Sequence, residues 1–374
     1  MIKSRAFWIG LLGSAAFLGI FFFAIIDDFD QVVDVFASAN YIYAIPSLAF
    51  YTLALWFRTI RWRYLLKPFT GESTRRALFP VVVVGYMANN LIPLRIGELM
   101  RAYYLSLREG ISTMAGFGTV ALERASDVIA LLLLVAIAAI VGAIGFQTTV
   151  SGVAEHVPGG VAVLTIGALL PFVAVFAVVA YVVVMSPESM RRLMGGMLFM
   201  IPPRIRVRII NLAMNLIEGL TVIRTWQGLL KVIALSLPVW IAEITMYYVI
   251  ALGFDIRSEF GSQIEFIAAI VAFGAAANLA GILPSSAGSL GPFELLGAAA
   301  LTTLGIDGDV AAAYALTVHM VLWAPVTIAG AIILFFDRTS FVNLARGARS
   351  VRGRRRDSAS NASHVSENSA ELKP

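Results

Sequence analysis

Long apolar runs separated by short polar connections are the main pattern of this 374-residue chain. The hydrocarbon core of a bilayer is about 30 Å thick, so a helix needs about 20 apolar residues to cross it. Six runs reach that length, and they are Phe7–Ile26, Tyr41–Trp62, Ala115–Gly145, Val161–Met185, Leu229–Gly253 and Val310–Phe336. The pattern therefore predicts an all-α polytopic membrane protein with six transmembrane helices.

Positive charge in the connections between these runs is strongly asymmetric. Six cations lie within residues 58–76, six more lie within 191–224, and Lys3 and Arg5 precede the first run. The connections that alternate with these are poor in cations, and they are 27–40, 146–160 and 254–263. Cytoplasmic loops carry an excess of Lys and Arg, so we expect a multi-pass protein of the cytoplasmic (inner) membrane with both termini in the cytoplasm.

Two further apolar segments are interrupted by proline. Each has a first arm, a proline and a second arm, and these are Ala77–Ile92, Pro93 and Ile96–Leu107, then Phe266–Leu283, Pro284 and Gly291–Leu304. A first arm of 16 to 18 residues is about 24–27 Å long as a helix, enough to pass the bilayer midplane. Two kinked helices that cross fully are the alternative, but they would spoil the charge asymmetry. We expect two re-entrant helical hairpins, one inserted from the cytoplasm and one from outside.

The two hairpins resemble each other and divide the integral membrane domain, 1–337, into similar halves. Each half, about 1–145 and 161–337, has three spans and one hairpin, so the odd crossing number inverts the second half relative to the first. The connection 186–228 contains a predicted basic amphipathic helix at 204–224, which would lie on the anionic inner leaflet. Interrupted backbone at such depth must lie inside protein or beside water. The predicted hairpin breaks are Asn89, Asn90, Pro93, Gly97, Asn278, Pro284, Gly288 and Gly291.

Composition agrees with a membrane protein and excludes several kinds of site. The chain is 59% hydrophobic and only 14% charged, whereas soluble domains are about 25% charged. It has no cysteine, which excludes disulfides and cysteine-bound metals, and its three histidines are too few for most transition-metal sites. We therefore expect no metal and no cofactor. The basic, then polar tail 338–374 is expected to be disordered and carries the surplus positive charge, so nucleic acid is not an expected partner.

Charged side chains inside the third apolar run indicate a function or a tight structural pair, because charge at membrane depth is costly. Glu123 and Asp127 lie four residues apart on one helix face, and Arg124 can pair with Asp127. Two acids beside one arginine need a further cation, a bound ion or a proton.

The second arm of the first hairpin carries Arg95, Glu98 and Arg101 at spacings of three. One interpretation is that Arg95 or Arg101 neutralises Glu123 or Asp127 and only holds the hairpin in place. The interpretation that we favour for the group as a whole is that its arginines face a cavity and bind phosphate oxygens.

Other charged residues have simpler interpretations. Glu294 opens the second arm of the outer hairpin, where a carboxylate suits the helix N-terminus. Glu243 can be satisfied by a neighbouring tyrosine, and His319 is expected to be a packed, hydrogen-bonded histidine. An interfacial belt of aromatic and basic residues explains the end of the second run, which contains Arg58, Arg61, Trp62 and Arg63.

A resemblance to a known family is carried by the ordered motifs Asn90…Pro93-Leu94-Arg95-Ile96-Gly97-Glu98…Arg101, Glu123-Arg124…Asp127 and Pro284…Gly288…Gly291…Glu294. They are similar to the flippase-like membrane family, also called the lysylphosphatidylglycerol synthase transmembrane region or UPF0104. The resemblance covers nearly all of residues 1–337 and implies translocation of a polar-headed lipid or lipid-linked intermediate. Members that synthesise lysylphosphatidylglycerol carry an aminoacyl-transferase domain, whereas only a short polar tail follows Phe336, so synthesis is not expected.

We therefore expect a flippase of a polar-headed, anionic lipid and not an enzyme, with membrane lipids as its partners. A secondary transporter of a small anionic solute, a membrane-embedded lipid-modifying enzyme and a non-catalytic assembly subunit are the alternatives. The sequence has no zinc-protease helix, nucleophile elbow or phosphate-binding P-loop, and it does not indicate an oligomeric state. The predicted substrate-binding residues are Arg95, Glu98, Arg101, Glu123, Arg124, Asp127 and Glu294.

Overall fold

The computed structural model describes residues 5–70, 78–92, 96–109, 111–145, 187–198, 206, 207, 210, 225–280 and 287–337. Within these ranges all regular structure is helical and no strand occurs, as the sequence predicted. Several predicted features lie outside the described residues, and they are the span 161–185, most of the helix 204–224, the tail 338–374, Pro93, Arg95 and Pro284.

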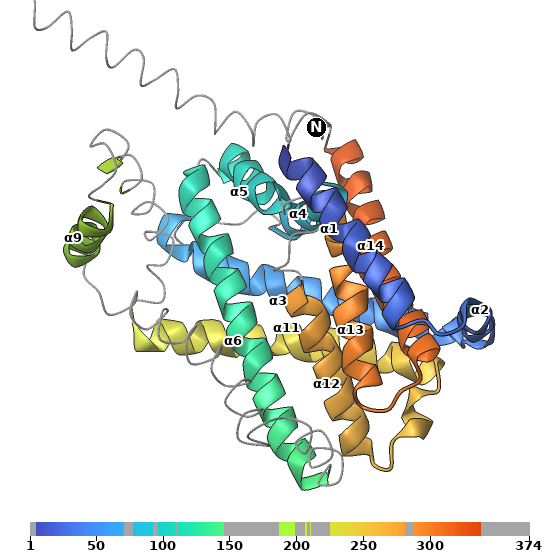
Figure 1. The fold of residues 1–374 in the computed structure, drawn as a ribbon. Coiled ribbons are helices and arrows are strands. Elements are labelled where there is room, and N and C mark those ends of the chain that lie inside the picture. Colours follow the sequence, from blue (N-terminus) through green and yellow to red (C-terminus); the bar gives the residue numbers. More distant parts are fainter. Residues whose placement is uncertain are drawn as a thin grey trace, which may run out of the picture.

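The described helices follow one another in an order that matches the two predicted halves (Figure 1). In the first half they are α1 (Arg5–Ala24), α2 (Phe29–Ser38), α3 (Ala44–Thr70), α4 (Leu78–Leu91), α5 (Ile96–Glu109) and α6 (Thr113–Gly145). The connection between the halves contains α9 (Pro187–Met197). In the second half they are α11 (Trp226–Gly253), α12 (Gln263–Leu279), α13 (Pro292–Thr302) and α14 (Gly308–Phe336), with the 3-10 turns η1 (Tyr41–Tyr43), η4 (Ile256–Glu259) and η6 (Ala287–Ser289) between helices.

By length and composition, two of the described helices can cross a bilayer, α11 over Gln227–Gly253 and α14 over Gly308–Phe336. A third candidate is the pair formed by Gly10–Ala24 of α1 and by α2, which is bent by 90°. The sequence had assigned 27–40 to a connection, but most of it forms α2, because Asp28 caps the helix by accepting the Asp30 backbone N–H. The described part of the chain is therefore a helical membrane protein with two or three candidate spans.

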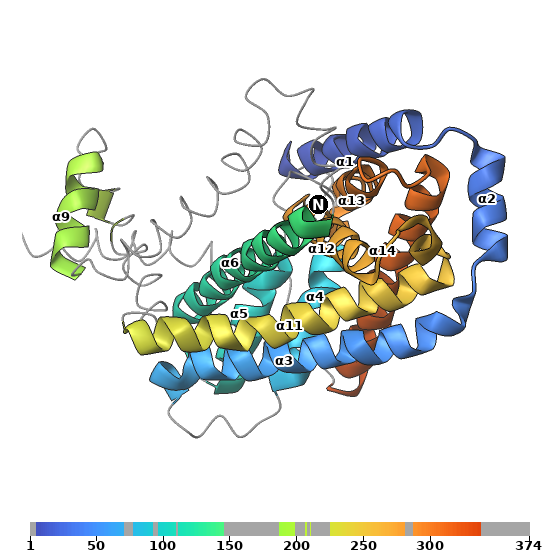
Figure 2. The ribbon, with the colours of Figure 1, turned by 90° about the horizontal axis from the view of Figure 1, so that it is seen from below.

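Helix packing repeats between the halves with exchanged partners. The first hairpin arm α4 packs on α14, and its counterpart α12 packs on α6. The second arms pack within their own halves, α5 on α6 and α13 on α14. At the centre α3 and α11 run side by side and cross the direction of α6 and α14 (Figures 1 and 2). Such an exchange of equivalent partners is the packing that a two-fold internal repeat produces.

Helix α3 has an apolar outer face and a charged inner face. Its exposed side chains include Leu53, Trp56 and Ile60, whereas Arg58 and Arg61 retain only 4% and 0% of their surface exposed. A helix of a water-soluble protein has the opposite arrangement, with apolar residues towards the core. The inverted arrangement is the one that lipid favours, and it directs two guanidinium groups into the protein.

Candidate functional site

The acids predicted on the third run are buried in α6 and share one arginine. Glu123 and Asp127 are 0% and 4% exposed. Arg61 of α3 spans both, with its Nη2 3.2 Å from Glu123 Oε1 and its Nη1 2.6 Å from Asp127 Oδ1. Arg101 of α5 forms a further ion pair with Glu123. The expectation that a hairpin arginine neutralises an acid of the third run is thus confirmed for Arg101.

A second arginine of α3 extends the network to α11 and α12. Arg58 pairs with Asp127, at 3.4 Å, and with Glu243 of α11. Tyr247 donates a 2.8 Å hydrogen bond to Glu243, which confirms that a tyrosine satisfies this acid. Asn278, near the end of α12, donates in turn to the Tyr247 hydroxyl at 2.9 Å. A continuous chain of polar contacts therefore links the first hairpin to the tip of the second.

Arg124 lies at the rim of this network, with 31% of its side chain exposed. Its guanidinium is 3.3 Å from Glu123, 3.4 Å from Asp127 and 3.8 Å from Glu98. It also donates a 3.0 Å hydrogen bond to the Tyr86 hydroxyl of α4. Arg124 is thus the arginine of the network with the most accessible side chain.

We call these interacting groups the charge cluster, and its members are Arg58, Arg61, Glu98, Arg101, Glu123, Arg124, Asp127 and Glu243. Four guanidinium groups oppose four carboxylates, so the formal charges balance, as groups removed from water require. Aromatic rings add cation–π contacts, with the Arg101 guanidinium 3.8 Å from the centre of the Trp62 ring. Three buried donors, the Nε atoms of Arg61, Arg101 and Arg124, find no hydrogen-bond acceptor among the described residues.

The interpretation of Arg58, Arg61 and Trp62 as an interfacial belt is wrong. All three are buried, and only Arg63 of that group is exposed. The reason is that α3 does not end with the apolar run at Trp62 but continues to Thr70, which leaves the two arginines well inside the helix. Their spacing of three residues on one helix face was the available signal.

Glu294 pairs with His319 of α14, and among the contacts of the described residues it meets no arginine of the charge cluster. Its other carboxylate oxygen accepts the Gly291 backbone N–H at 2.8 Å, which confirms its role at the N-terminus of α13. His319 Nε2 lies 2.9 Å from the Gly288 carbonyl oxygen, so this histidine is packed and hydrogen-bonded as predicted. Gly288 and Gly291 have φ angles of 74° and 97°, which glycine adopts without strain.

The tips of the two hairpins meet beside Trp323 of α14. Asn90 donates hydrogen bonds to the Trp323 carbonyl at 3.1 Å and to the Thr327 hydroxyl at 2.9 Å, and the Trp323 indole donates to the Asn90 carbonyl at 3.3 Å. A Cβ added at Gly288 would lie 2.9 Å from the same indole ring. The predicted break residues Asn90 and Gly288 are therefore brought together, whereas Gly97 lies inside the first turn of α5 against Asn89.

The described residues contain no group of three His, Asp or Glu side chains arranged to hold a metal ion. The chemistry of the site is that of guanidinium groups, carboxylates and tyrosine hydroxyls in an apolar helix assembly. Such an arrangement can bind oxyanions through charge-assisted hydrogen bonds.

Comparison with known proteins identifies the family. Residues 7–330 match the lysylphosphatidylglycerol synthase TM region family. Glycosyltransferase AglD of Haloferax volcanii is 26% identical over 333 residues, which are 82% of this chain and 47% of that protein. UPF0104 membrane protein MJ1595 of Methanocaldococcus jannaschii is 31% identical over 100 residues, 26% of this chain and 30% of that protein.

A UPF0104 membrane protein of Methanothermobacter thermautotrophicus is 24% identical over 293 residues, 76% of this chain and 82% of the relative. The matches thus span less than half the length of AglD and of MJ1595. No solved structure matches this chain. Because the family match covers most of the sequence and agrees with the motifs quoted above, the chain belongs to the lysylphosphatidylglycerol synthase TM region family.

Proposed function

We propose that this protein translocates a lipid with an anionic polar head across the cytoplasmic membrane. The observation that carries the proposal is the charge cluster, because charges held inside a membrane protein mark pathways for polar substrates. The unpaired Nε donors of Arg61, Arg101 and Arg124 favour an anionic head, since phosphate or carboxylate oxygens accept hydrogen bonds from guanidinium groups. Glu98, Glu123 and Asp127 would orient these arginines.

The proposed topology has six spans and two hairpins inserted from opposite faces, with both termini in the cytoplasm. It is supported by the exchanged helix packing of the two halves and by the contact between Asn90 and Trp323 at the hairpin tips. In this arrangement the polar head would pass along α6 and the hairpin tips while its hydrocarbon chains remain in lipid.

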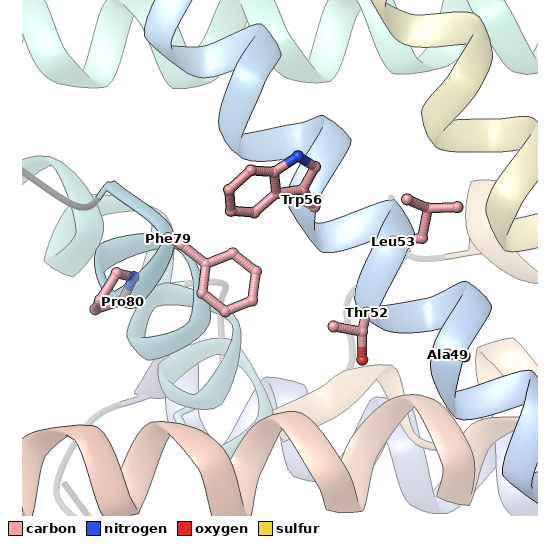
Figure 3. A pocket seen from close by; sticks show the side chains of 6 residues that line it. All are labelled: Ala49, Thr52, Leu53, Trp56, Phe79 and Pro80. Atoms are coloured by element: carbon pink, nitrogen blue, oxygen red, sulfur yellow. The ribbon is translucent and has the colours of Figure 1, made fainter.

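An apolar groove on the outside of the helix assembly favours a lipid over a small soluble anion. The groove has a volume of about 680 Å³ and lies between α3 and α4 (Figure 3). It is lined by Ala49, Thr52, Leu53, Trp56, Phe79 and Pro80. Because α3 carries this groove on its outer face and Arg58 and Arg61 on its inner face, one helix offers separate surfaces to a hydrocarbon chain and a charged head.

The names of the relatives leave an enzyme as an alternative. AglD is named a glycosyltransferase, but the match covers 47% of that protein. We propose that the part shared with this chain handles the lipid rather than transferring a group. Turnover of a labelled lipid by the purified protein would favour the lipid-modifying alternative, and uptake of glycerol phosphate into vesicles would favour the small-solute transporter.

Replacing Arg124 with alanine is expected to slow translocation about tenfold, because a charge-assisted hydrogen bond contributes about 1.5–3 kcal/mol. The measurement is the rate at which fluorescent phosphatidylglycerol in reconstituted vesicles becomes accessible to dithionite. Arg63→Ala is the matched control, since Arg63 is exposed on the outer part of α3, and it should keep the wild-type rate. Equal rates in wild type and Arg124→Ala would remove Arg124 from the substrate path.

A further inference from the structure

A buried acid–histidine pair lies at the base of the second hairpin, apart from the charge cluster. Glu294 is 1% exposed and His319 is 7% exposed, and the ring of Phe293 packs against the imidazole with 4.6 Å between ring centres. Both imidazole nitrogens face oxygen atoms: Nδ1 faces Glu294 Oε1, and Nε2 faces the Gly288 carbonyl. Histidine therefore has no nitrogen left for an external donor.

These contacts determine how many protons the pair holds. The Gly288 carbonyl oxygen carries no hydrogen, so the 2.9 Å contact requires a proton on Nε2. A second proton must then lie between Nδ1 and Glu294 Oε1, on either atom. The remaining oxygen, Glu294 Oε2, accepts the Gly291 N–H. The pair thus holds one proton more than an ionised carboxylate beside a neutral imidazole.

Loss of this proton would break one contact of His319. The charged carboxylate of Glu294 would attract the remaining imidazole proton to Nδ1, because charge-assisted hydrogen bonds are the stronger ones. The bare Nε2 would then face the Gly288 carbonyl, and two acceptors repel each other. Gly288 is the residue of η6 that touches the Trp323 indole, and it lies near the Asn90 carbonyl of the first hairpin. Deprotonation would therefore release the contact between the hairpin tips.

The helices packed against this pair carry other titratable side chains, and each has its own partner. Tyr314 of α14 donates to the Tyr247 carbonyl at 2.8 Å, and the Tyr247 hydroxyl is engaged with Glu243 and Asn278. The remaining groups also have partners elsewhere: Asp309 of α14 with the backbone N–H groups of Asp27 and Asp28, Tyr86 of α4 with Arg124, Arg58 of α3 with Asp127, and Glu265 of α12 with Ser262. The described side chains of α1 include no titratable group.

We infer that Glu294 and His319 form a binding site for one exchangeable proton, and that this proton is the coupling ion of translocation. The second part rests on the proposed function. With the proton bound, the second hairpin tip is held by His319 through Gly288; without it, the tip is free to separate from Trp323 and from the first hairpin. A proton gradient would then drive the lipid in one direction, because each proton that crosses passes through the latched and the released state.

The proton site can be tested without any transport assay. Selective ¹⁵N labelling of histidine gives resonances from three residues in this chain, and those of His319 are assigned by their loss in His319→Gln. Between about pH 5 and pH 9, the His319 nitrogens of the wild type should change their protonation pattern. In Glu294→Gln the amide can still donate to Nδ1 and its oxygen can still accept from Gly291, so the imidazole should remain the neutral Nε2–H form throughout. Unchanged His319 resonances in the wild type over this range would overturn the proton site.

The coupling is tested with the fluorescent phosphatidylglycerol assay in vesicles whose membrane potential is clamped with valinomycin and potassium. Reversing the pH gradient should change the wild-type rate by about fivefold or more. Glu294→Gln should give equal rates under both gradients, while Glu259→Gln, an exposed glutamate of η4, should respond like the wild type. Wild-type translocation that ignores the gradient would overturn the coupling and leave the proposed function intact. Absence of translocation at every pH would overturn the proposed function, and the resonances of His319 would still decide the proton site.

Discussion

Replacing Glu123 with glutamine is expected to lower the free energy of unfolding by about 3–5 kcal/mol, the usual cost of removing one partner from a buried ion pair. Glu123 is fully buried and is the counter-charge for Arg101, for Arg61 at 3.2 Å and for Arg124 at 3.3 Å. A neutral amide would leave these guanidinium groups with an uncompensated positive charge in an apolar surrounding. The measurement is the unfolding midpoint of the purified protein in detergent, together with its folded yield.

Glu98→Gln is the matched control for this substitution. Glu98 belongs to the same cluster, but it lies 3.8 Å from Arg124 with 18% of its side chain exposed, so we expect a loss of at most about 1 kcal/mol. Combining Glu123→Gln with Arg101→Gln should recover part of the loss, because the double variant removes both members of one pair. Equal destabilisation by Glu98→Gln and Glu123→Gln would contradict the pairing described here.

Local spacing was sufficient to identify part of the charge cluster. Glu123 and Asp127 are four residues apart on α6, and the sequence correctly indicated that they need cations from elsewhere. Arg101 was among the predicted partners, since the hairpin arm precedes α6 directly. The predicted Arg95 lies outside the described residues.

Arg58 and Arg61 were missed because the end of an apolar run does not mark the end of a helix. Lipid contact requires apolar residues only on the outer face of α3, and the inner face is free to carry charge. The ion pairs of Arg58 with Glu243, and of Arg61 with Asp127, join residues far apart in the sequence. Helix packing alone brings them together, and a single sequence contains no direct signal for it.

The hairpins were predicted from their prolines and glycines, but the partners of their tips were not. That Asn90 would contact Trp323 of α14 depends on the exchange of partners between the halves. Gly97 was predicted as part of a break, since glycine is the usual residue of an irregular turn. The structure instead places it inside α5, where the absence of a side chain allows two helices to approach.

Gly97→Ala is therefore expected to destabilise the protein by about 1–3 kcal/mol, as overpacking of a close contact usually does. A Cβ at this position would lie under 3.0 Å from the backbone nitrogen of Asn89 and from the carbonyl oxygen of Gly85. Backbone atoms cannot rotate away, so α4 and α5 would have to separate. The measurement is again the unfolding midpoint in detergent, combined with the translocation rate, because a displaced α5 would also pull Arg101 away from Glu123.

Gly116→Ala distinguishes a specific clash from a general intolerance of alanine at buried glycines. A Cβ at Gly116 of α6 would lie 3.5 Å from the Ala102 Cβ of α5, an ordinary van der Waals contact. Alanine also favours the helix over glycine by up to about 1 kcal/mol, so this variant should be as stable as the wild type or more stable. The two glycines flank α5 on its contacts with α4 and α6. If both substitutions destabilised the protein equally, the contact of Gly97 with α4 would not be what fixes α5; if only Gly97→Ala did so, the position of Arg101 in the charge cluster would depend on the first hairpin being closed.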